Sequence, residues 1–179
     1  MTSRTLNGRA GRAGITADDV EQVTVTSIPF GERMAEPAPA TMLGAKFSIP
    51  YAVAASLVLG RTDLAAFEDA AVSDPRIRRL AGRVEIASDP EMNPRRPDDY
   101  PTAVVTLALR DGRTLTGSTT VVRGDSAAPA DLGEIVDKFE TLAAPVLGAA
   151  GARAVVEAVD RLDELKDVRE VTSRLVTAA

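Results

Sequence analysis

The stretch that decides the fold runs from Thr102 to Val122 and reads TAVVTLALR-DG-RTLTGSTTVV. Both arms are rich in β-branched residues, and apolar side chains recur at alternate positions, which is typical of strands. The dipeptide Asp111-Gly112 between the arms suits the positive φ angles of a type I′ turn. These residues therefore predict an antiparallel hairpin.

Two more strands are predicted before this hairpin. Residues 20–28 are mostly β-branched with partial alternation, and Pro29 ends the run. Residues 84–87 alternate in the same way and lead into residues 89–101, where four prolines indicate a loop. Residues 29–45 hold further prolines and glycines and predict an extended surface loop.

The best-marked helix lies within residues 46–60. Ser48 is its N-cap candidate, Pro50 lies in its first turn, and Gly60 stands where it would end. This segment is apolar nearly all round, so we expect it in the core. Apolar spacing and helix-breaking residues predict further helices. They lie at residues 63–71, from residue 75 onward, from residue 131 onward with breaks at Pro145 and Gly148, and at two places within residues 152–179.

The order of these elements predicts the fold class. Strands alternate with helices too irregularly for a doubly wound parallel sheet. We therefore predict an α+β fold, a two-layer sandwich of a small, mostly antiparallel sheet and helices. The 179 residues, 45% of them hydrophobic, suffice for a single domain over 1–179, with 1–18 as a loose entry segment and 150–179 as C-terminal helices.

Composition excludes several functions. The chain has no Cys and no His, which rules out disulfides, thiolate chemistry, Ser-His-Asp catalysis and the usual zinc sites. A net charge of -5 argues against nucleic acid as a partner. No apolar run approaches the roughly 18–20 residues of a membrane span, and the N-terminus lacks the apolar segment of a secretory signal. We expect a soluble cytoplasmic protein without a membrane partner, cofactor or metal.

One candidate site is the start of the helix that Ser48 caps. Free N–H groups and the positive end of the helix dipole favour an anion there, with Lys46 just outside and Tyr51 in the first turn. The Tyr51 hydroxyl could donate to a bound acid. The alternative is structural: Ser48 caps a buried helix, Tyr51 packs with its hydroxyl satisfied, and Lys46 is solvated.

Arginines form two other candidate groups. Arg95 and Arg96 could clamp a carboxylate or phosphate, but Asp98, Asp99 and Tyr100 beside them favour a solvated loop. The second group lies on and after a short predicted helix and consists of Arg76, Arg78, Arg79 and Arg83. We interpret their spacing as scattering them around the helix, which predicts a solvated face. Acidic residues occur on amphipathic helices without metal-ligand spacing, so no metal site is assigned.

Residues 45–60, AKFSIPYAVAASLVLG, strongly resemble the C-terminal domain of the MmgE/PrpD family. This family includes 2-methylcitrate dehydratase, cis-aconitate decarboxylase and iminodisuccinate epimerase. Further segments are similar to the family pattern in the same order along the chain: residues 14–25, 73–80, 84–86, 104–114 and 131–139. The likeness thus extends over nearly the whole chain.

The resemblance implies a lid-like α+β domain that closes an active site against a larger all-helical domain. It implies Tyr51 as a catalytic residue, Lys46 and Ser48 as substrate-binding residues, and a small di- or tricarboxylic acid as substrate. The family's catalytic His, Asp and Lys residues lie mostly in the helical domain and just before the entry strand, and this chain begins after that stretch and has no His. We therefore expect one component of a dehydratase-like lyase that needs a separate helical MmgE/PrpD partner chain and is inactive alone. The alternative is a non-catalytic module that binds a small acid or a protein, or forms a homo-oligomer.

Overall fold

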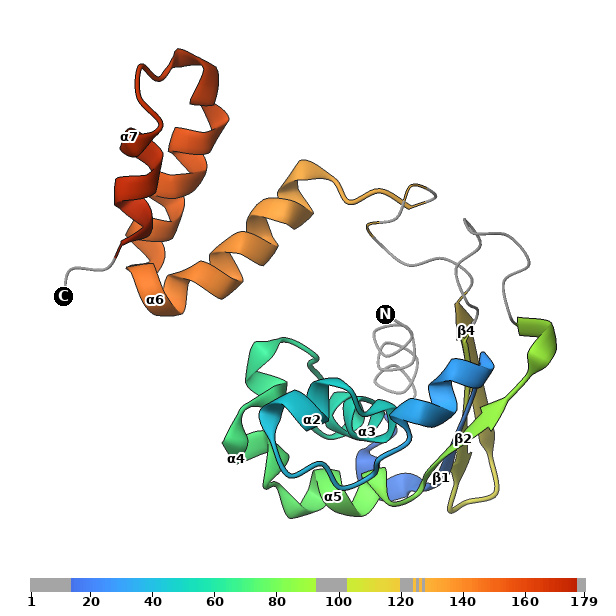
Figure 1. Ribbon diagram of the computed structural model, residues 1–179. Coiled ribbons are helices and arrows are strands. Elements are labelled where there is room, and N and C mark those ends of the chain that lie inside the picture. Colours follow the sequence, from blue (N-terminus) through green and yellow to red (C-terminus); the bar gives the residue numbers. More distant parts are fainter. Residues whose placement is uncertain (1–13, 93–102, 120–123, 125, 127, 177–179) are drawn as a thin grey trace. The chain divides into compact units, whose positions relative to one another are not determined.

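The computed structural model describes residues 14–92, 103–119, 124, 126 and 128–176 (Figure 1). The chain divides into two compact units, unit 1 over Met1–Arg123 and unit 2 over Gly124–Ala179. Each is described by itself, and the organisation as one domain stays a prediction. The predicted loop with Arg95, Arg96, Asp98, Asp99 and Tyr100 lies outside the described residues, as do the first thirteen residues of the entry segment.

Unit 1 contains a four-stranded mixed sheet. Its strands are β1 (Val20–Ser27), β2 (Val84–Ser88), β3 (Ala103–Leu109) and β4 (Thr114–Thr119), in the order β2-β1-β3-β4. The β1–β3 and β3–β4 pairs are antiparallel, and the β1–β2 pair is parallel. Helices from the long β1–β2 connection pack on one side of the sheet (Figure 1). The predicted α+β sandwich is confirmed.

The helices of unit 1 are short. They are η1 (Ala17–Asp19), η2 (Pro29–Met34), α2 (Met42–Lys46), α3 (Ile49–Leu59), η3 (Leu64–Phe67), α4 (Asp69–Val72), α5 (Pro75–Ala81) and η4 (Pro90–Met92). The prediction of an extended loop over residues 29–45 was wrong, because η2 and α2 form there. Pro29 starts η2 with a φ angle suited to the first turn, and the Thr41 hydroxyl accepts from Gly44 N–H at 3.1 Å to cap α2.

The core lies between the helices and the sheet face that carries Val23 and Val25 of β1. These residues stand opposite Leu107 and Val105 of β3, so the four side chains share one face. Val20 is buried as well. In a regular strand its side chain would point to the face opposite that of Val23, but the β1–β3 register shifts between Val20 and Gln22. Such a bulge explains the partial alternation of the sequence in β1.

The turn between β3 and β4 differs from the predicted type I′. Type I′ needs a positive φ at both central residues, yet no described residue other than glycine has one. Gly112 has a φ of 85°, its N–H donates to Leu109 O at 3.0 Å, and Leu109 N–H donates to Arg113 O at 2.9 Å. The hairpin therefore has a three-residue loop with glycine at its left-handed position. The Asp111 carboxylate accepts from Arg113 N–H at 3.0 Å and holds this form.

The ends of α3 are as predicted. The Ser48 hydroxyl accepts from Tyr51 N–H at 3.0 Å, and Pro50 lies in the first turn. Gly60 closes the helix in the left-handed conformation, with φ 68° and ψ 8°, and its N–H donates to Ser56 O at 3.0 Å. Three sequence signals thus fix this helix independently.

Replacing Gly60 by alanine is expected to lower the free energy of unfolding by about 1–2 kcal/mol, because an L-residue is strained in the left-handed region. No atom lies within 4 Å of the added Cβ, so backbone strain is the whole effect. Gly82→Ala is the matched control, since Gly82 ends α5 with φ -66° and alanine fits there. Urea denaturation of both variants checks this, and equal losses would contradict it.

Unit 2 is helical. Its elements are α6 (Leu132–Asp160), η5 (Leu162–Glu164), α7 (Arg169–Thr172) and η6 (Ser173–Leu175). The chain bends within α6 at Gly148, whose φ of 72° and ψ of 158° suit glycine alone (Figure 1). The small core of the unit consists of Ala152, Val155, Ala158 and Val171. Leu132, Ile135 and Leu142, whose apolar spacing indicates this helix, are exposed within the unit.

By length and composition α6 is apolar enough to cross a membrane. The bend at Gly148 divides it into two arms, each shorter than the roughly 20 residues of a span. Charged residues also lie on both arms, among them Asp137 and Glu157. The bend and these charges thus distinguish α6 from a straight helix that is apolar throughout.

Candidate functional site

The three residues predicted to form a site lie around the junction of α2 and α3. Lys46 is the last residue of α2, Phe47 caps that helix at its C-terminus, and Ser48 is the N-cap of α3. Tyr51 lies in the first turn of α3. The structure therefore brings Lys46, Ser48 and Tyr51 to one region, which we call the Ser48 corner.

Ser48 is enclosed within this corner. Its side chain is 1% exposed, and its hydroxyl donates to Glu36 O while accepting from Tyr51 N–H. The donated bond ties the segment before α2 to the start of α3. In this structure both hydrogen-bonding functions of the Ser48 hydroxyl are thus used within the protein.

Tyr51 is likewise buried, with 1% of its surface exposed. Its hydroxyl donates to Ala66 O at 2.8 Å, and its ring lies 5.8 Å from that of Phe67, centroid to centroid. Burial, and to a smaller extent the Asp74 carboxylate, raises the pKa of Tyr51. The hydroxyl therefore keeps its proton and acts as a donor that fastens η3 to α3.

The first turn of α3 has few donors left for an anion. Pro50 has no N–H, Tyr51 N–H is bonded to the Ser48 hydroxyl, and Ala52 N–H donates to Ser48 O at 3.0 Å. Ile49 alone could offer its amide to a ligand. The predicted anion site at this terminus thus loses most of its backbone donors, although the roles assigned to Lys46, Ser48 and Tyr51 stay predictions.

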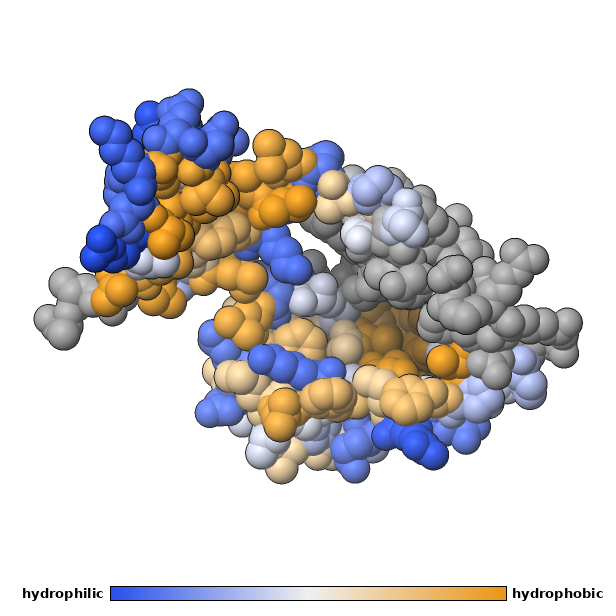
Figure 2. Space-filling model, turned by 45° about the horizontal axis from the view of Figure 1, so that its top comes forward, coloured by the Kyte–Doolittle hydropathy of each residue, from blue (hydrophilic) through white to orange (hydrophobic). Residues whose placement is uncertain are grey.

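Lys46 differs from the other two residues because it is exposed. It lies on the outer face of α2, which we define as Met42, Leu43, Lys46 and Phe47. Leu43 and Phe47 are 66% and 63% exposed, whereas Ala45 faces the core and is fully buried. Figure 2 shows apolar surface exposed on both units. If another protein surface covered these apolar side chains, it would exclude water from around Lys46. The lysine would then attract an anion more strongly than it does in water.

Residues 4–164 match the family model of the MmgE/PrpD C-terminal domain. This match covers most of the chain, including the whole described sheet, the Ser48 corner and the bend in α6. The chain belongs to the MmgE/PrpD family. No curated protein matches it.

The MmgE/PrpD domain also has a recess that the sequence interpretation missed. Arg76, Arg79 and Arg83 line it together with Asp18 and apolar side chains, so three of the four arginines predicted to scatter around a short helix border one recess. Arg76, Arg78 and Arg79 are exposed, as a solvated face predicts. Arg76 and Arg79, three residues apart, share one face of α5, which was the available signal, and Arg83 follows the helix. Arg78 points elsewhere, and its guanidinium donates to Val72 O at 3.0 Å.

Several of the described acidic residues bind arginines or cap helices. Asp74 caps α5 by accepting from Arg76 N–H at 2.8 Å. The Arg76 guanidinium beside it holds the pKa of Asp74 below its ordinary value. Within the described ranges no three His, Cys, Asp or Glu side chains lie together as metal ligands would. The expected absence of a metal and a cofactor stays a prediction.

Proposed function

We propose that this MmgE/PrpD domain is the lid of a dehydratase-like lyase that acts on a small di- or tricarboxylic acid. The observation that carries the proposal is the family match over residues 4–164. In the reaction a base removes the proton next to a carboxylate, the electron pair forms a C=C bond, and hydroxide leaves the neighbouring carbon with a proton from an acid. Decarboxylation and epimerisation are the alternatives within the same chemistry.

The proton transfers need a base whose pKa lies near neutrality. Histidine is the side chain most often used for them, because its ordinary pKa lies near neutrality, and the sequence contains none. The proposal therefore includes a separate all-helical MmgE/PrpD chain that supplies the base.

The outer face of α2 supports a place for that partner. Leu43 and Phe47 expose apolar surface on either side of Lys46. Covering them would remove this surface from water and place the Lys46 ammonium at the boundary between the two chains. In the proposal Lys46 binds a substrate carboxylate there, and Ser48 holds the segment behind it through Glu36 O.

Tyr51 can act on a substrate in this proposal only if its present hydrogen bond is broken. Its hydroxyl is bonded to Ala66 O, so it can donate to a substrate only after η3 moves away from α3. The raised pKa of Tyr51, caused first by burial, makes it a proton donor rather than a base at neutral pH. Closure of the lid on its partner is the step that would open this bond.

The test is co-expression with a helical MmgE/PrpD chain encoded beside this one, followed by assay on 2-methylcitrate and citrate. We expect association and turnover by the pair, and none by either chain alone. Lys46→Gln should lower kcat/KM about tenfold or more, since a charge-assisted hydrogen bond contributes about 1.5–3 kcal/mol. Lys138→Gln, an exposed change in α6, is the matched control. Turnover by this chain alone, or by the pair regardless of Lys46, would refute the assignment.

A second candidate function is a non-catalytic module that binds a small acid or a protein. The enclosed hydroxyls of Ser48 and Tyr51 favour it, because both are already satisfied within the domain. The two functions differ in one outcome of the same experiment. Association without turnover on either acid would support the binding module.

A further inference from the structure

A recess in unit 1 lies between three segments that are distant in the sequence. It is formed by Ile15–Asp18 before β1, by Leu57–Gly60 at the end of α3, and by residues 76–83 on and after α5. Its volume is about 450 Å³, within the range of roughly 300–1,000 Å³ that small-molecule sites occupy. We call it the arginine recess.

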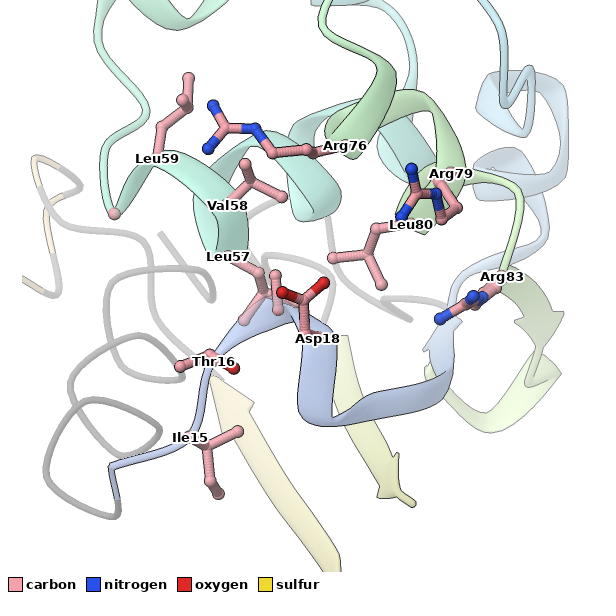
Figure 3. Close-up of a pocket in the computed structure, with 12 residues that line it drawn as sticks. Ile15, Thr16, Asp18, Leu57, Val58, Leu59, Arg76, Arg79, Leu80 and Arg83 are labelled. Atoms are coloured by element: carbon pink, nitrogen blue, oxygen red, sulfur yellow. The ribbon is translucent and has the colours of Figure 1, made fainter.

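Basic side chains border one side of the arginine recess. In Figure 3 the guanidinium groups of Arg79 and Arg83 and the Asp18 carboxylate turn toward the space beside Leu80, while Arg76 reaches toward Leu59. Arg83 is half-buried and held in place, since its guanidinium donates to Val20 O at 3.1 Å. This hydrogen bond uses one N–H group of the Arg83 guanidinium and leaves its other N–H groups for a ligand.

Among the arginines of the recess, Arg79 has the most hydrogen-bond donors available for a ligand. It makes no hydrogen bond or ion pair with the residues that the structure describes. Arg76, by contrast, is bound to Asp74 at 2.7 Å between Nη2 and the carboxylate. A guanidinium presents five donors in a plane and binds a carboxylate through two parallel hydrogen bonds. Arg79 is therefore the group best able to form such a pair.

The balance of charge selects the kind of anion. Arg76, Arg79, Arg83 and Asp18 all line the recess, and Asp74, which is not part of the lining, forms an ion pair with Arg76. The Asp18 carboxylate also interacts with Arg76 electrostatically. Three positive and two negative groups leave one uncompensated positive charge. A monoanion fits this balance, whereas a dianion would be repelled by Asp18.

The other wall of the arginine recess is apolar. Ile15, Leu57, Val58 and Leu59 are half-buried there, and Leu80 is almost completely buried. An apolar chain of a few carbons that covers the accessible surface of these side chains is removed from water together with them, which favours binding.

We propose that the arginine recess binds a monocarboxylic acid with a short apolar chain, its carboxylate on Arg79 and Arg83 and its chain on Leu57 and Leu80. The site is separate from the Ser48 corner, because none of Lys46, Ser48 and Tyr51 lines it. It lies at the C-terminal end of α3 and the corner at the N-terminal end, 11 residues apart, which is about 16 Å along the axis. The proposal is therefore independent of the lyase function.

The experiment is isothermal titration of the full chain with hexanoate, hexanol and inorganic phosphate at the same ionic strength. We expect saturable binding of hexanoate and at least about tenfold weaker binding of the other two, since each lacks one of the two features. Arg79→Gln should weaken hexanoate binding about tenfold or more, because a charge-assisted pair is lost. Arg78→Gln is the matched control on the same helix and should leave the affinity within about twofold.

Each other result overturns the proposal. Equal binding of hexanol would show an apolar recess without a role for the arginines. Tighter binding of phosphate than of hexanoate would refute both the preference for a monoanion and the role of the apolar wall in binding. Equal weakening by Arg79→Gln and Arg78→Gln would show diffuse attraction to the basic helix, and no saturable binding of hexanoate would remove the site. Thermal unfolding of both variants verifies that each is folded.

Discussion

Replacing Leu107 by alanine is expected to lower the free energy of unfolding by about 2–5 kcal/mol. Leu107 is fully buried in β3, and its neighbours across the sheet are Val23 of β1 and Leu115 of β4. The helices of the β1–β2 connection cover the same face, so the vacated space is enclosed and can close only in part. Lost burial and an unfilled cavity therefore both contribute.

Leu43→Ala is the control for this prediction, because it removes the same atoms from a side chain that is 66% exposed. Its effect on stability should stay within about 0.5 kcal/mol. Urea denaturation measures both variants, and the slope of each curve shows whether the unfolding transition is unchanged. A similar small effect for both would mean that the face of β3 with Leu107 is not the centre of the core. In the co-expressed pair, Leu43→Ala should instead weaken association, since it lies on the outer face of α2.

Local signals predicted those elements that local chemistry determines. Ser48, Pro50 and Gly60 mark the ends of α3 by hydrogen bonding and backbone preference within a few residues, so the sequence suffices. The strand pattern of residues 102–122 likewise locates the hairpin. Its turn was not predictable from Asp111-Gly112 alone, because the choice between a two-residue and a three-residue loop depends on where the β3–β4 register is set.

The arginine recess depends on longer-range contacts. The spacing of Arg76 and Arg79 places them on one face of α5, and Arg83 follows that helix. That this face meets Asp18 and the end of α3 depends on the packing of α5 beside α3 and on the path of the chain into β1. Sequence spacing can group side chains on one element, whereas tertiary packing decides what stands opposite them.

The apolar face of the first arm of α6 shows the same limit. The periodicity of Leu132, Ile135 and Leu142 correctly predicted a helix, but within unit 2 these side chains remain exposed. An apolar stripe predicts that a helix packs against something, and not that its partner lies in the same compact unit. The site residues have a comparable ambiguity, because the pattern that places Tyr51 in the first turn of α3 fits both a substrate contact and a structural hydrogen bond.

Tyr51→Phe should lower the free energy of unfolding by about 1–3 kcal/mol, which is the cost of leaving the buried Ala66 carbonyl without its donor. The ring remains, so its packing against Phe67 is preserved and the lost hydroxyl accounts for the effect. Phe67→Leu is the control, since it disturbs the same contact without touching the hydrogen bond. Chemical denaturation of the chain alone measures both.

Activity of the co-expressed pair then separates the two roles of Tyr51. A structural hydroxyl predicts that Tyr51→Phe loses stability and keeps kcat at temperatures where the variant is folded. A hydroxyl that donates to substrate in the transition state predicts a fall of kcat and kcat/KM together, by about 10²-fold for a lost acid catalyst, and a pH profile that loses its basic limb. Phe67→Leu should shift stability in both cases without changing that profile. Unchanged kcat in Tyr51→Phe would remove Tyr51 from the mechanism and leave Lys46 as the group of the Ser48 corner that reaches the substrate.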